Sequence, residues 1–476
     1  MTYPDLHLFV AGEWIAAGRR DTIPVLNPAS GEVIGMLPMA TAADLDRAAA
    51  SAADAFKSWR RTSPMERSRI LRDAARLMRE RMEADARTMT LEQGKPLAQS
   101  RSELAASADC FDWYAEEGRR AYGRVIPARN PDAMLTVLRE PVGPVAAFTP
   151  WNFPASQVAR KLAPALAAGC TCVVKPSEET PGSALAIIRA LDDVGLPKGV
   201  LHLVFGVPGE VAEHLIAAPE IRKVSFTGST QIGKLIGKLA ADGVKRTTLE
   251  LGGHAPVIIF DDADIEAAAK LSAAVKTRNA GQACISPTRF LVQDAVHDRF
   301  VAAFKQALEA VTIGDGLDKS SDMGPLANKR RVDAMDSLTL DAVAQGGVPV
   351  LAGKRIGNAG NFWSPTLIAD APLTARANID EPFGPFALTR RFSRDEEAIA
   401  EANRLPYGLA AYAFTKDRGR AGLVRREVES GLIGINSYAV TWPETPFGGV
   451  KESGYGSEGG AEGLDVYLSV KFISEV

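Results

Sequence analysis

The sequence is poor in the two residue types that most often build disulfide scaffolds and metal sites. Four cysteines and five histidines occur among its 476 residues. Cysteines this sparse, with no scaffold spacing, are typical of a protein from a reducing compartment. Cys170 and Cys172 alternate along an apolar strand-like run, but no further cysteine or histidine stands near them at ligand spacing. We therefore interpret Cys110, Cys170 and Cys172 as structural, and no metal site is predicted.

The sequence also lacks a strong excess of charge and any long apolar run. Its formal net charge is −3, which gives no electrostatic reason to expect nucleic acid or an anionic membrane as a partner. No stretch approaches the ~20 apolar residues that span a bilayer, and residues 1–10 have none of the features of a secretory signal. We expect a cytoplasmic protein with no membrane partner.

What the sequence does contain is the alternating pattern of an α/β protein. Short apolar runs at 145–148, 172–174, 201–204 and 224–226 alternate with helical patterns at 154–168, 183–194, 209–217 and 230–241. This alternation predicts a parallel sheet covered by helices, which is typical of a nucleotide-binding layer. A second α/β stretch begins near Gly252, and two amphipathic helices are expected within residues 43–87. The chain length favours two or three such units.

Two short motifs suggest covalent chemistry at a carbonyl carbon. Cys284 follows a Gly-Gln turn, and Glu250 stands upstream of it, before a Gly-Gly pair. A thiolate adds readily to carbonyl carbon, and a carboxylate in apolar surroundings can then activate water against the resulting thioester. Glu250 has a second interpretation as a buried structural carboxylate, although an unpaired one would be costly. A cysteine nucleophile with a carboxylate base is the hypothesis that these residues raise.

Five motifs in a fixed order make the chain resemble the aldehyde dehydrogenase superfamily along nearly its whole length. They lie at residues 148–154, 175–178, 226–229, 249–253 and 279–284. The resemblance implies a Rossmann-like cofactor domain, an α/β catalytic domain and a small β arm that joins subunits into a homodimer or homotetramer. The expected boundaries are 1–120 and 142–251 for the cofactor domain, 252–460 for the catalytic domain, and 121–141 with 461–476 for the arm.

A dinucleotide site is expected at the glycine-rich turn that contains Gly228, Ser229 and Gly233. Backbone N–H groups at such a strand-to-helix junction favour a pyrophosphate. The Gly-x-Gly-x-x-Gly fingerprint is absent, so local sequence leaves a simple turn as the alternative at Gly228. The resemblance implies further cofactor contacts at Thr149, Pro150, Trp151, Lys175, Ser177, Glu178, Glu381 and Phe383.

The residue at Glu178 bears on which dinucleotide is bound. A carboxylate there accepts ribose hydroxyls and repels a 2′-phosphate, so NAD is expected over NADP. Local sequence alone allows a simpler interpretation, in which Lys175 and Glu178 form an ordinary surface pair. The resemblance favours the cofactor role.

Cys284, Glu250 and Asn152 are the catalytic residues that the resemblance implies. Asn152, with the Cys284 backbone N–H, would hold the oxyanion formed when Cys284 adds to an aldehyde. Local sequence explains Asn152 equally well as a helix N-cap before Pro154. Glu250 would activate water against the thioester, whereas superfamily members that pass the acyl group to coenzyme A lack this glutamate. The expected product is therefore a free carboxylate.

Two arginines indicate what enters the pocket. Arg160 and Arg278 align with carboxylate-binding arginines of succinate-semialdehyde dehydrogenases, although a local ion pair or solvent exposure is the alternative for any arginine. The leading hypothesis is NAD-dependent oxidation of an ω-carboxylated semialdehyde such as succinate semialdehyde. Gly460 replaces a serine that also contacts the carboxylate in those enzymes, and Trp442 and Phe447 add aromatic surface. An aromatic or broad-specificity aliphatic aldehyde dehydrogenase is therefore the alternative.

The residues after Cys284 differ from those of some semialdehyde dehydrogenases. Ile285 and Ser286 replace the second cysteine of some semialdehyde dehydrogenases, so no disulfide switch is expected at Cys284. A non-catalytic protein that keeps the fold is an alternative of another class, since folds do not dictate function. An unreactive Cys284 and no aldehyde-dependent NADH would support that alternative.

Overall fold

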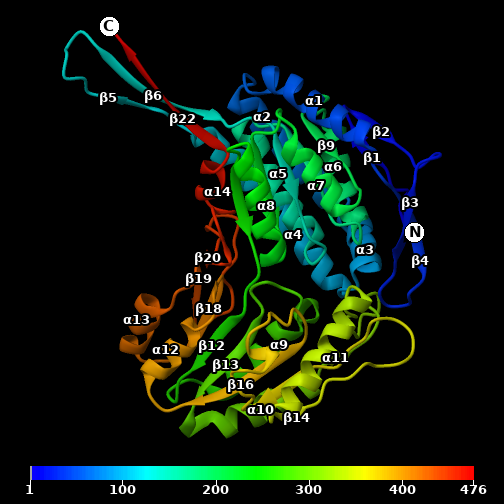
Figure 1. The fold of residues 1–476 in the computed structure, drawn as a ribbon, viewed down its shortest axis with the longest axis vertical. Helices are drawn as coiled ribbons and strands as arrows, with labels where there is room; N and C mark the ends of the chain where they lie inside the picture. The colour runs from blue at the N-terminus through cyan, green and yellow to red at the C-terminus, as the bar shows by residue number, and fades with distance from the viewer. Residues whose placement is uncertain (1–2) are drawn as a thin grey trace.

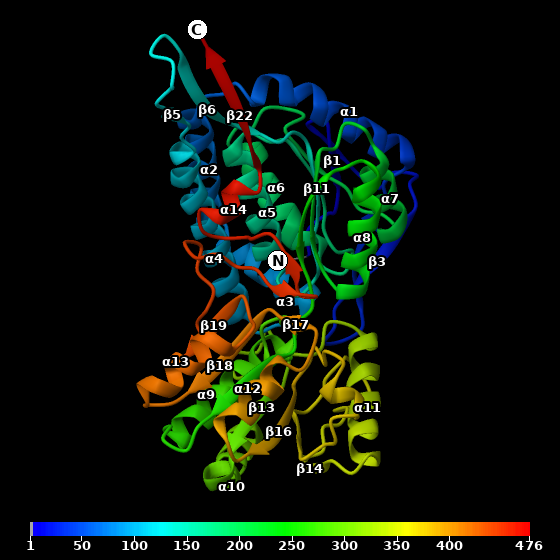
Figure 2. The same cartoon turned by 60° about the vertical axis from the view of Figure 1, so that its left-hand side comes forward.

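The computed structural model describes residues 3–476, which form two α/β units and a projecting β arm (Figure 1). The first unit lies above the second in both views, and the arm extends from the first unit with the C-terminus at its tip (Figures 1 and 2). No helix in the described part of the chain is long and apolar enough to cross a membrane.

The first unit is built on an eight-stranded sheet in the order β2-β1-β9-β8-β7-β10-β11-β21. Its strands are β1 (Leu8–Val10), β2 (Glu13–Ile15), β7 (Val145–Phe148), β8 (Cys172–Lys175), β9 (Leu201–Leu203), β10 (Lys223–Thr227), β11 (Arg246–Glu250) and β21 (Gly454–Tyr455). The five strands from β9 to β11 run parallel, as the alternating pattern predicts. The chain order reverses between β7 and β10, and α/β proteins bind nucleotides at the carboxyl ends of strands at such a switch point.

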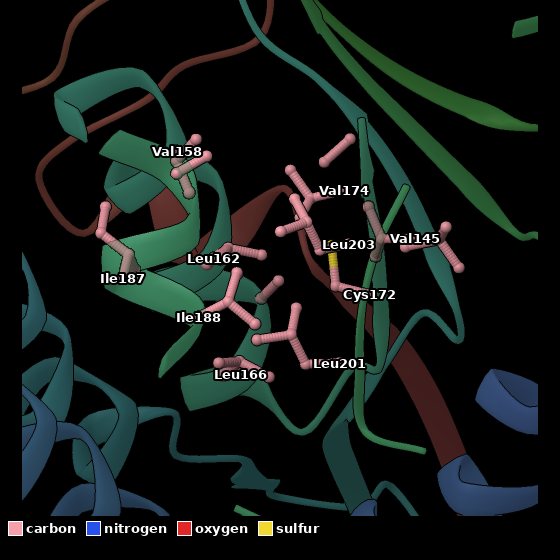
Figure 3. Packing of buried hydrophobic residues seen from close by; sticks show 14 of the residues in the cluster. Val145, Val158, Leu162, Leu166, Cys172, Val174, Ile187, Ile188, Leu201 and Leu203 are labelled. Atoms are coloured by element: carbon pink, nitrogen blue, oxygen red, sulfur yellow. The ribbon is translucent and has the colours of Figure 1, made fainter. Parts of the chain in front are cut away.

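Helices cover the first sheet because their apolar residues recur at helical spacing. They are α1 (Ala42–Trp59), α2 (Pro64–Glu80), α3 (Met82–Gln93), α4 (Leu97–Glu117), α5 (Pro154–Ala168), α6 (Pro181–Asp193), α7 (Pro208–Ala217) and α8 (Thr230–Asp242). Val158, Leu162 and Leu166 stand four residues apart on α5 and are fully buried. Figure 3 shows Leu162 with Ile188 of α6, both turned toward the sheet. This packing fixes the helix that follows the 148–154 motif.

One expectation about the N-terminal helices is wrong. Residues 43–87 contain parts of three helices rather than two, because the chain leaves helical geometry at Arg81 (φ −94°, ψ 0°). The Arg81 N–H still bonds to Leu77 O, while the Arg81 carbonyl already accepts from Ala84 N of the next helix. A break without proline or glycine carries no strong signal in the sequence.

The second unit is built on a seven-stranded sheet in the order β14-β15-β16-β13-β12-β18-β19. Its strands are β12 (Ala255–Ile259), β13 (Pro287–Gln293), β14 (Val348–Leu351), β15 (Thr366–Ala369), β16 (Phe386–Phe392), β18 (Ala410–Phe414) and β19 (Leu432–Ile435). Its helices are α9 (Ile265–Thr277), α10 (His297–Glu309), α11 (Lys329–Ala344), α12 (Asp395–Asn403) and α13 (Arg418–Glu427). All strands except β14 run parallel, which confirms a second α/β layer.

The arm is a three-stranded antiparallel sheet in the order β22-β6-β5. Its strands are β5 (Arg124–Ile126), β6 (Met134–Pro141) and β22 (Leu468–Glu475). The smaller elements are β3 (Thr22–Leu26), β4 (Val33–Pro38), β17 (Tyr407–Gly408), β20 (Val450–Lys451) and α14 (Glu462–Asp465). Strand β21 lies within the expected catalytic domain at 252–460, yet it pairs with β11 of the first sheet. The chain thus returns to the first unit before it enters the arm.

Candidate active site

The candidate site lies where the two sheets meet end to end. Strand β11 ends at Glu250 and β12 begins soon afterwards at Ala255, so the carboxyl edge of the first sheet faces the amino edge of the second. Backbone approach is close there: a Cβ added at Gly253 would lie 2.4 Å from the Cys284 carbonyl oxygen. The Gly-Gly pair after Glu250 therefore lets the base candidate and the nucleophile candidate come together.

The loop that carries Cys284 has a strained backbone. It follows a short 3-10 turn, η2 (Arg278–Gly281), in which Asn279 and Ala280 adopt positive φ angles of 50° and 51°. Gly281 also has a positive φ, and a Cβ there would lie 2.1 Å from the Gly384 carbonyl oxygen. Strain of this kind persists only where surrounding contacts over-determine the backbone, and it is frequent at functional sites.

Cys284 differs from the other three cysteines in its access to solvent. Cys110, Cys170 and Cys172 are buried, whereas Cys284 is partly exposed. Burial together with the carboxylates of Glu381 and Glu250 raises the pKa of the Cys284 thiol to about 12, and Arg160 acts in the opposite direction. The thiol is therefore the stable form at neutral pH, and it has to lose its proton before the sulfur can act as a nucleophile.

Glu250 is buried and has no hydrogen-bond partner among the described residues for either carboxylate oxygen. Burial and the neighbouring Glu458 carboxylate raise the pKa of Glu250, and the cations of Lys161 and Arg160 offset only part of that effect. A structural carboxylate would normally be paired or hydrogen-bonded. Its orphaned oxygens therefore favour the catalytic interpretation over the structural one.

A buried ion pair beside Glu250 was missed by the sequence analysis. Lys161 Nζ lies 2.5 Å from Glu458 Oε1 and donates to Ser225 Oγ at 3.0 Å. Lys161 comes from α5, and Glu458 lies on the segment that follows β21. The only signal in the sequence is a lysine within an otherwise apolar helix. From the local pattern alone, such a lysine is expected at the border of the buried face rather than inside it.

Asn152 follows β7 and is buried against the Cys284 loop. Its side-chain Nδ2 donates to Gln282 O at 3.3 Å, and its Oδ1 has no partner in the described chain. The N-cap alternative is wrong, because the N-cap of α5 is Phe153 and no side chain of the cap residue bonds to the helix. The amide is thus directed at the Cys284 loop rather than at the helix.

The expected cofactor residues lie on both sides of the junction between the sheets. Thr149, Pro150 and Trp151 follow β7, and Gly228 and Ser229 follow β10, so all five stand at the switch point of the first sheet. Ser229 is the N-cap of α8 and accepts from Ile232 N at 3.4 Å. A helix that begins at a switch point presents free N–H groups to an anion.

Unsatisfied polar atoms at this edge fit a bound dinucleotide. Thr149 Oγ1 and Thr227 Oγ1, at the ends of β7 and β10, are buried without a hydrogen-bond partner in residues 3–476. Gly228 leaves no room for a larger residue, since an added Cβ would lie 2.5 Å from the Phe226 ring. Buried orphan hydroxyls are unfavourable unless a ligand or water satisfies them.

Lys175 and Glu178 form an ion pair at the end of β8, with Ser177 between them. Burial lowers the pKa of Lys175, while Glu178 acts in the opposite direction. The adjoining Glu179 was not predicted: it accepts from Asn328 and pairs with Arg330 at the start of α11. Each carboxylate at this edge is therefore paired with a cation, and Glu179 ties the edge to the second unit.

Glu381 and Phe383 reach the same crevice from the second unit. Burial raises the pKa of Glu381 to about 8, and its carboxylate accepts from Gly253 N at 3.1 Å. The Phe383 ring meets Trp151 edge-on at 5.5 Å. Arg331, which was also missed, lies over the Phe383 ring at 5.8 Å, and its Nε is buried without a partner in the described chain. Cofactor candidates from distant segments thus converge.

The four substrate candidates occupy different depths. Arg160 is half-buried, lies 4.6 Å from the centroid of the Phe447 ring, and is close enough to Cys284 to affect its pKa. Arg278 is exposed, and its positive charge contributes to lowering the pKa of Lys95. Trp442 is 54% exposed and Phe447 only 5%. Within residues 3–476 neither arginine has a carboxylate within ion-pair distance, although Arg278 does match the alternative of a solvent-exposed side chain.

Comparison with known proteins agrees with this architecture. Residues 14–473 match the family described as Aldehyde dehydrogenase family. A 4-(hydroxymethyl)benzenesulfonate dehydrogenase from Comamonas testosteroni is 48% identical over 470 residues, which cover 98% of each chain. The NADP(+) succinate-semialdehyde dehydrogenase of Escherichia coli (strain K12) is 44% identical over 465 residues, covering 98% of this chain and 96% of the relative. Succinate-semialdehyde dehydrogenase from Burkholderia pseudomallei superposes with a TM-score of 0.97 at 41% identity, covering 98% of this chain and 97% of that structure.

Proposed function

The chain belongs to the aldehyde dehydrogenase family, and we propose that it oxidises an aldehyde bearing a carboxylate at its far end, with succinate semialdehyde as the first candidate. The observation that carries this substrate class is Arg160. Its guanidinium is half-buried near Cys284 and has no carboxylate partner in the described chain. A partly desolvated guanidinium is well suited to bind a carboxylate through two parallel hydrogen bonds.

The residues at the junction support a two-stage reaction at Cys284. The Cys284 thiol releases its proton to solvent water, its sulfur adds to the aldehyde carbon as a thiolate, and the new oxyanion is held by Asn152 Nδ2 and the Cys284 N–H. A dinucleotide held between the β7 and β10 edge and Glu381 would supply the acceptor for the hydride that leaves this carbon, and Cys284 would then carry the acyl group as a thioester. Glu250 then takes a proton from water, the hydroxide adds to the thioester carbon, and the carbon–sulfur bond breaks to release the acid.

The environment of Glu250 supports its role as the base. Because burial and Glu458 raise its pKa, ionised Glu250 is a stronger base than an exposed glutamate. Its orphaned oxygens are free to accept from water. Water is the acceptor of the acyl group in this scheme, and the product is a free carboxylate.

We further propose NAD rather than NADP as the cofactor. Glu178, which pairs with Lys175 at the end of β8, and Glu179, which pairs with Arg330, place two carboxylates at this edge. A 2′-phosphate would meet these carboxylates, whereas ribose hydroxyls would donate to them. A kcat/KM for NAD that exceeds that for NADP by about tenfold or more is expected, and Glu178→Gln should narrow the difference.

An acid-bearing aromatic aldehyde is the second candidate substrate. Trp442 adds exposed aromatic surface to the segment before Phe447. Gly460, which stands where the resemblance expects a serine, has φ +60° and no room for a Cβ, which would lie 2.5 Å from Glu462 Oε2. One carboxylate anchor of the short semialdehyde is therefore absent, and the similar protein from Comamonas testosteroni is named for an aromatic sulfonate.

A matched panel of aldehydes tests the substrate. NADH formation should be compared for succinate semialdehyde, 4-carboxybenzaldehyde, butyraldehyde and benzaldehyde, so that chain type and charge vary separately. A kcat/KM advantage of about 100-fold for the two acids over their uncharged partners corresponds to ~2.7 kcal/mol and supports the arginine contact. Parity between charged and uncharged aldehydes would contradict the acid-bearing substrate while leaving the chemistry of Cys284 in place.

We also propose that a second copy of the chain covers the arm. Val470 and Val125 are 70% exposed, and Phe472 and Met134 are also largely exposed. The outer edge of β22 has no neighbouring strand within residues 3–476, and an uncovered apolar edge strand favours association. Val470→Lys with Phe472→Glu should lower the mass measured by light scattering to that of a smaller assembly, whereas an unchanged mass would contradict the proposal.

A further inference from the structure

A buried ion pair lies directly beneath Asn152. Lys95 follows α3 and Glu103 lies in α4, and their side chains are 1% and 2% exposed. Lys95 Nζ lies 2.5 Å from Glu103 Oε2. Burying two charges costs several kcal/mol per ion, and this cost is offset only where further hydrogen bonds satisfy both groups. The remaining contacts of the pair therefore indicate what it holds in place.

Glu103 holds the start of the helix that follows Asn152. Its Oε1 accepts from Ala155 N at 2.9 Å and from Ser156 N at 3.1 Å. These are N–H groups of the first turn of α5, whose own N-cap residue, Phe153, makes no side-chain bond. A carboxylate at a helix N-terminus satisfies free N–H groups and interacts favourably with the helix dipole. Glu103 thus caps α5 from a distant element.

Lys95 holds the main chain of Asn152 itself. Its Nζ donates to Asn152 O at 2.8 Å and lies 4.3 Å from the centroid of the Phe153 ring. A second donor reaches the same carbonyl from the Cys284 loop, because Asn279 Nδ2 donates to Asn152 O at 2.8 Å. The carbonyl of Asn152 is therefore fixed by two donors from different units, while Glu103 fixes the next turn.

The same contacts tie Asn152 to the nucleophile loop. Asn279 Nδ2 also donates to Gln282 O at 3.1 Å, and Gln93 Nε2, two residues before Lys95, donates to Asn279 Oδ1 at 2.8 Å. Asn152 Nδ2 donates to Gln282 O. A shift of the Lys95 head group would therefore move the Asn152 main chain relative to the Cys284 loop.

We propose that Lys95 and Glu103 are positioning residues for Asn152, which set the direction of its amide toward the atom that becomes an oxyanion on Cys284. The proposal rests on the oxyanion role of Asn152 in the proposed function. Electrostatic stabilisation depends on donors held where charge develops, so a small displacement of the amide should lower the rate of acyl chemistry. It should leave untouched a reaction of Cys284 that develops no oxyanion.

The test compares two reactions of Cys284 in the full-length protein. Acylation by p-nitrophenyl acetate passes through an oxyanion, whereas alkylation by iodoacetamide does not. Lys95→Met and Glu103→Gln are introduced together, so that no unpaired charge remains and an acceptor for Ala155 and Ser156 is kept. We expect acylation to fall about 30- to 100-fold, as for a misplaced or lost oxyanion donor, and alkylation to change less than about twofold.

A double-mutant cycle separates positioning from general damage. Asn152→Ala is measured alone and combined with the Lys95→Met/Glu103→Gln pair. If the pair acts through Asn152, the combined variant should acylate no more slowly than Asn152→Ala, because coupled residues are not additive. Losses that multiply, or acylation and alkylation that fall together, would overturn the proposal. If Asn152→Ala leaves acylation unchanged, the oxyanion role in the proposed function fails and the positioning role fails with it.

Glu92 provides a matched control for the loss of a capping carboxylate. It is buried, and it accepts from Gly182 N and Ser183 N in the first turn of α6, as Glu103 does for α5. It makes no contact with Asn152, so Glu92→Gln should leave the ratio of acylation to alkylation unchanged. Should the paired variant fail to fold, Glu103→Gln alone is expected to lower that ratio by about 3- to 10-fold. An unchanged ratio in a folded Glu103→Gln variant would overturn the proposal.

Discussion

The floor and the mouth of the pocket are built differently. The floor is the set of buried residues that hold the reacting atoms: Asn152, Lys95, Glu103, Asn279 and Gln282. Each floor residue takes part in hydrogen bonds to other segments, and all five are buried. The mouth consists of Arg160, Arg278 and Trp442, which are partly or largely exposed and whose side chains form no ion pair or hydrogen bond within residues 3–476.

This difference separates chemistry from substrate choice. Floor residues share partners, so replacing one shifts several others and changes the reaction for every aldehyde. Mouth side chains form no hydrogen bond or ion pair within residues 3–476, so a replacement there should change the preference among aldehydes more than the steps that all aldehydes share. The two regions should therefore respond differently to substitution, and the contrast can be measured as a ratio between substrates.

Replacing Glu250 should produce the largest effect, since it removes a step that every substrate requires. Glu250→Gln should lower steady-state kcat by about 10²- to 10⁴-fold, as expected for loss of a general base. One equivalent of NADH should still form rapidly, because the thioester forms and then persists. Rapid mixing measures the burst and the steady rate together. Cys284→Ser is the control that should abolish the burst, and an unchanged steady rate in Glu250→Gln would show that another group activates water.

The rate of Cys284 alkylation should change with pH by nearly as large a factor as kcat changes in Glu250→Gln. Burial and the carboxylates of Glu381 and Glu250 raise the pKa of this thiol to about 12. Below that pKa the reactive thiolate fraction rises about tenfold per pH unit, so iodoacetamide should react about 100-fold faster at pH 9 than at pH 7. Because burial raises the pKa of Glu381 to about 8, Glu381→Gln should speed the reaction mainly above pH 8, where this carboxyl is ionised. A rate that levels off below pH 8 would contradict the raised pKa.

At the mouth, Arg160 should have a larger effect than Arg278 because it is less exposed. Arg160 also influences the pKa of Cys284, so its role must be read from a ratio of kcat/KM between succinate semialdehyde and butyraldehyde. Arg160→Ala should lower that ratio by about 30- to 100-fold, and Arg278→Ala by about 3- to 10-fold, because solvent weakens an exposed contact. Arg160→Lys keeps the charge but loses the paired donors, so its loss in this ratio should lie between those of Arg160→Ala and Arg278→Ala. Equal losses of kcat/KM for both aldehydes would mean that Arg160 acts on the shared chemistry, as the floor residues do, and not on substrate choice.

The sequence alone predicts more of the fold than of the floor. The strand at Val145–Phe148 and the helix at Pro154–Ala168 are found with the predicted bounds, because an apolar run and a proline-led amphipathic pattern are local signals. Cys284, Glu250 and Asn152 stand in local motifs and could be nominated in the same way. Their supporting contacts could not.

The missed residues have partners that are remote in the chain. Lys95 donates to a carbonyl 57 residues away, and Lys161 pairs with Glu458 across 297 residues. A lone charge in the sequence is typical of the surface, since burial depends on where a distant partner lies. The return of β21 to the first sheet, which brings the Glu458 segment to Lys161, is a long-range event of the same kind.

Trp442 should give the smallest effect and the sharpest test of the mouth. Its ring is largely exposed, and its backbone N–H bonds only to Thr445 within its own turn. Stacking on an aromatic substrate is worth about 0.5–1.5 kcal/mol, so Trp442→Ala should lower kcat/KM for 4-carboxybenzaldehyde by about 2- to 10-fold and leave succinate semialdehyde within twofold. Trp442→Phe, which keeps an aromatic face, should restore most of the loss. A large loss for succinate semialdehyde would mean that this exposed residue acts on the reacting atoms, and the division between floor and mouth would not hold.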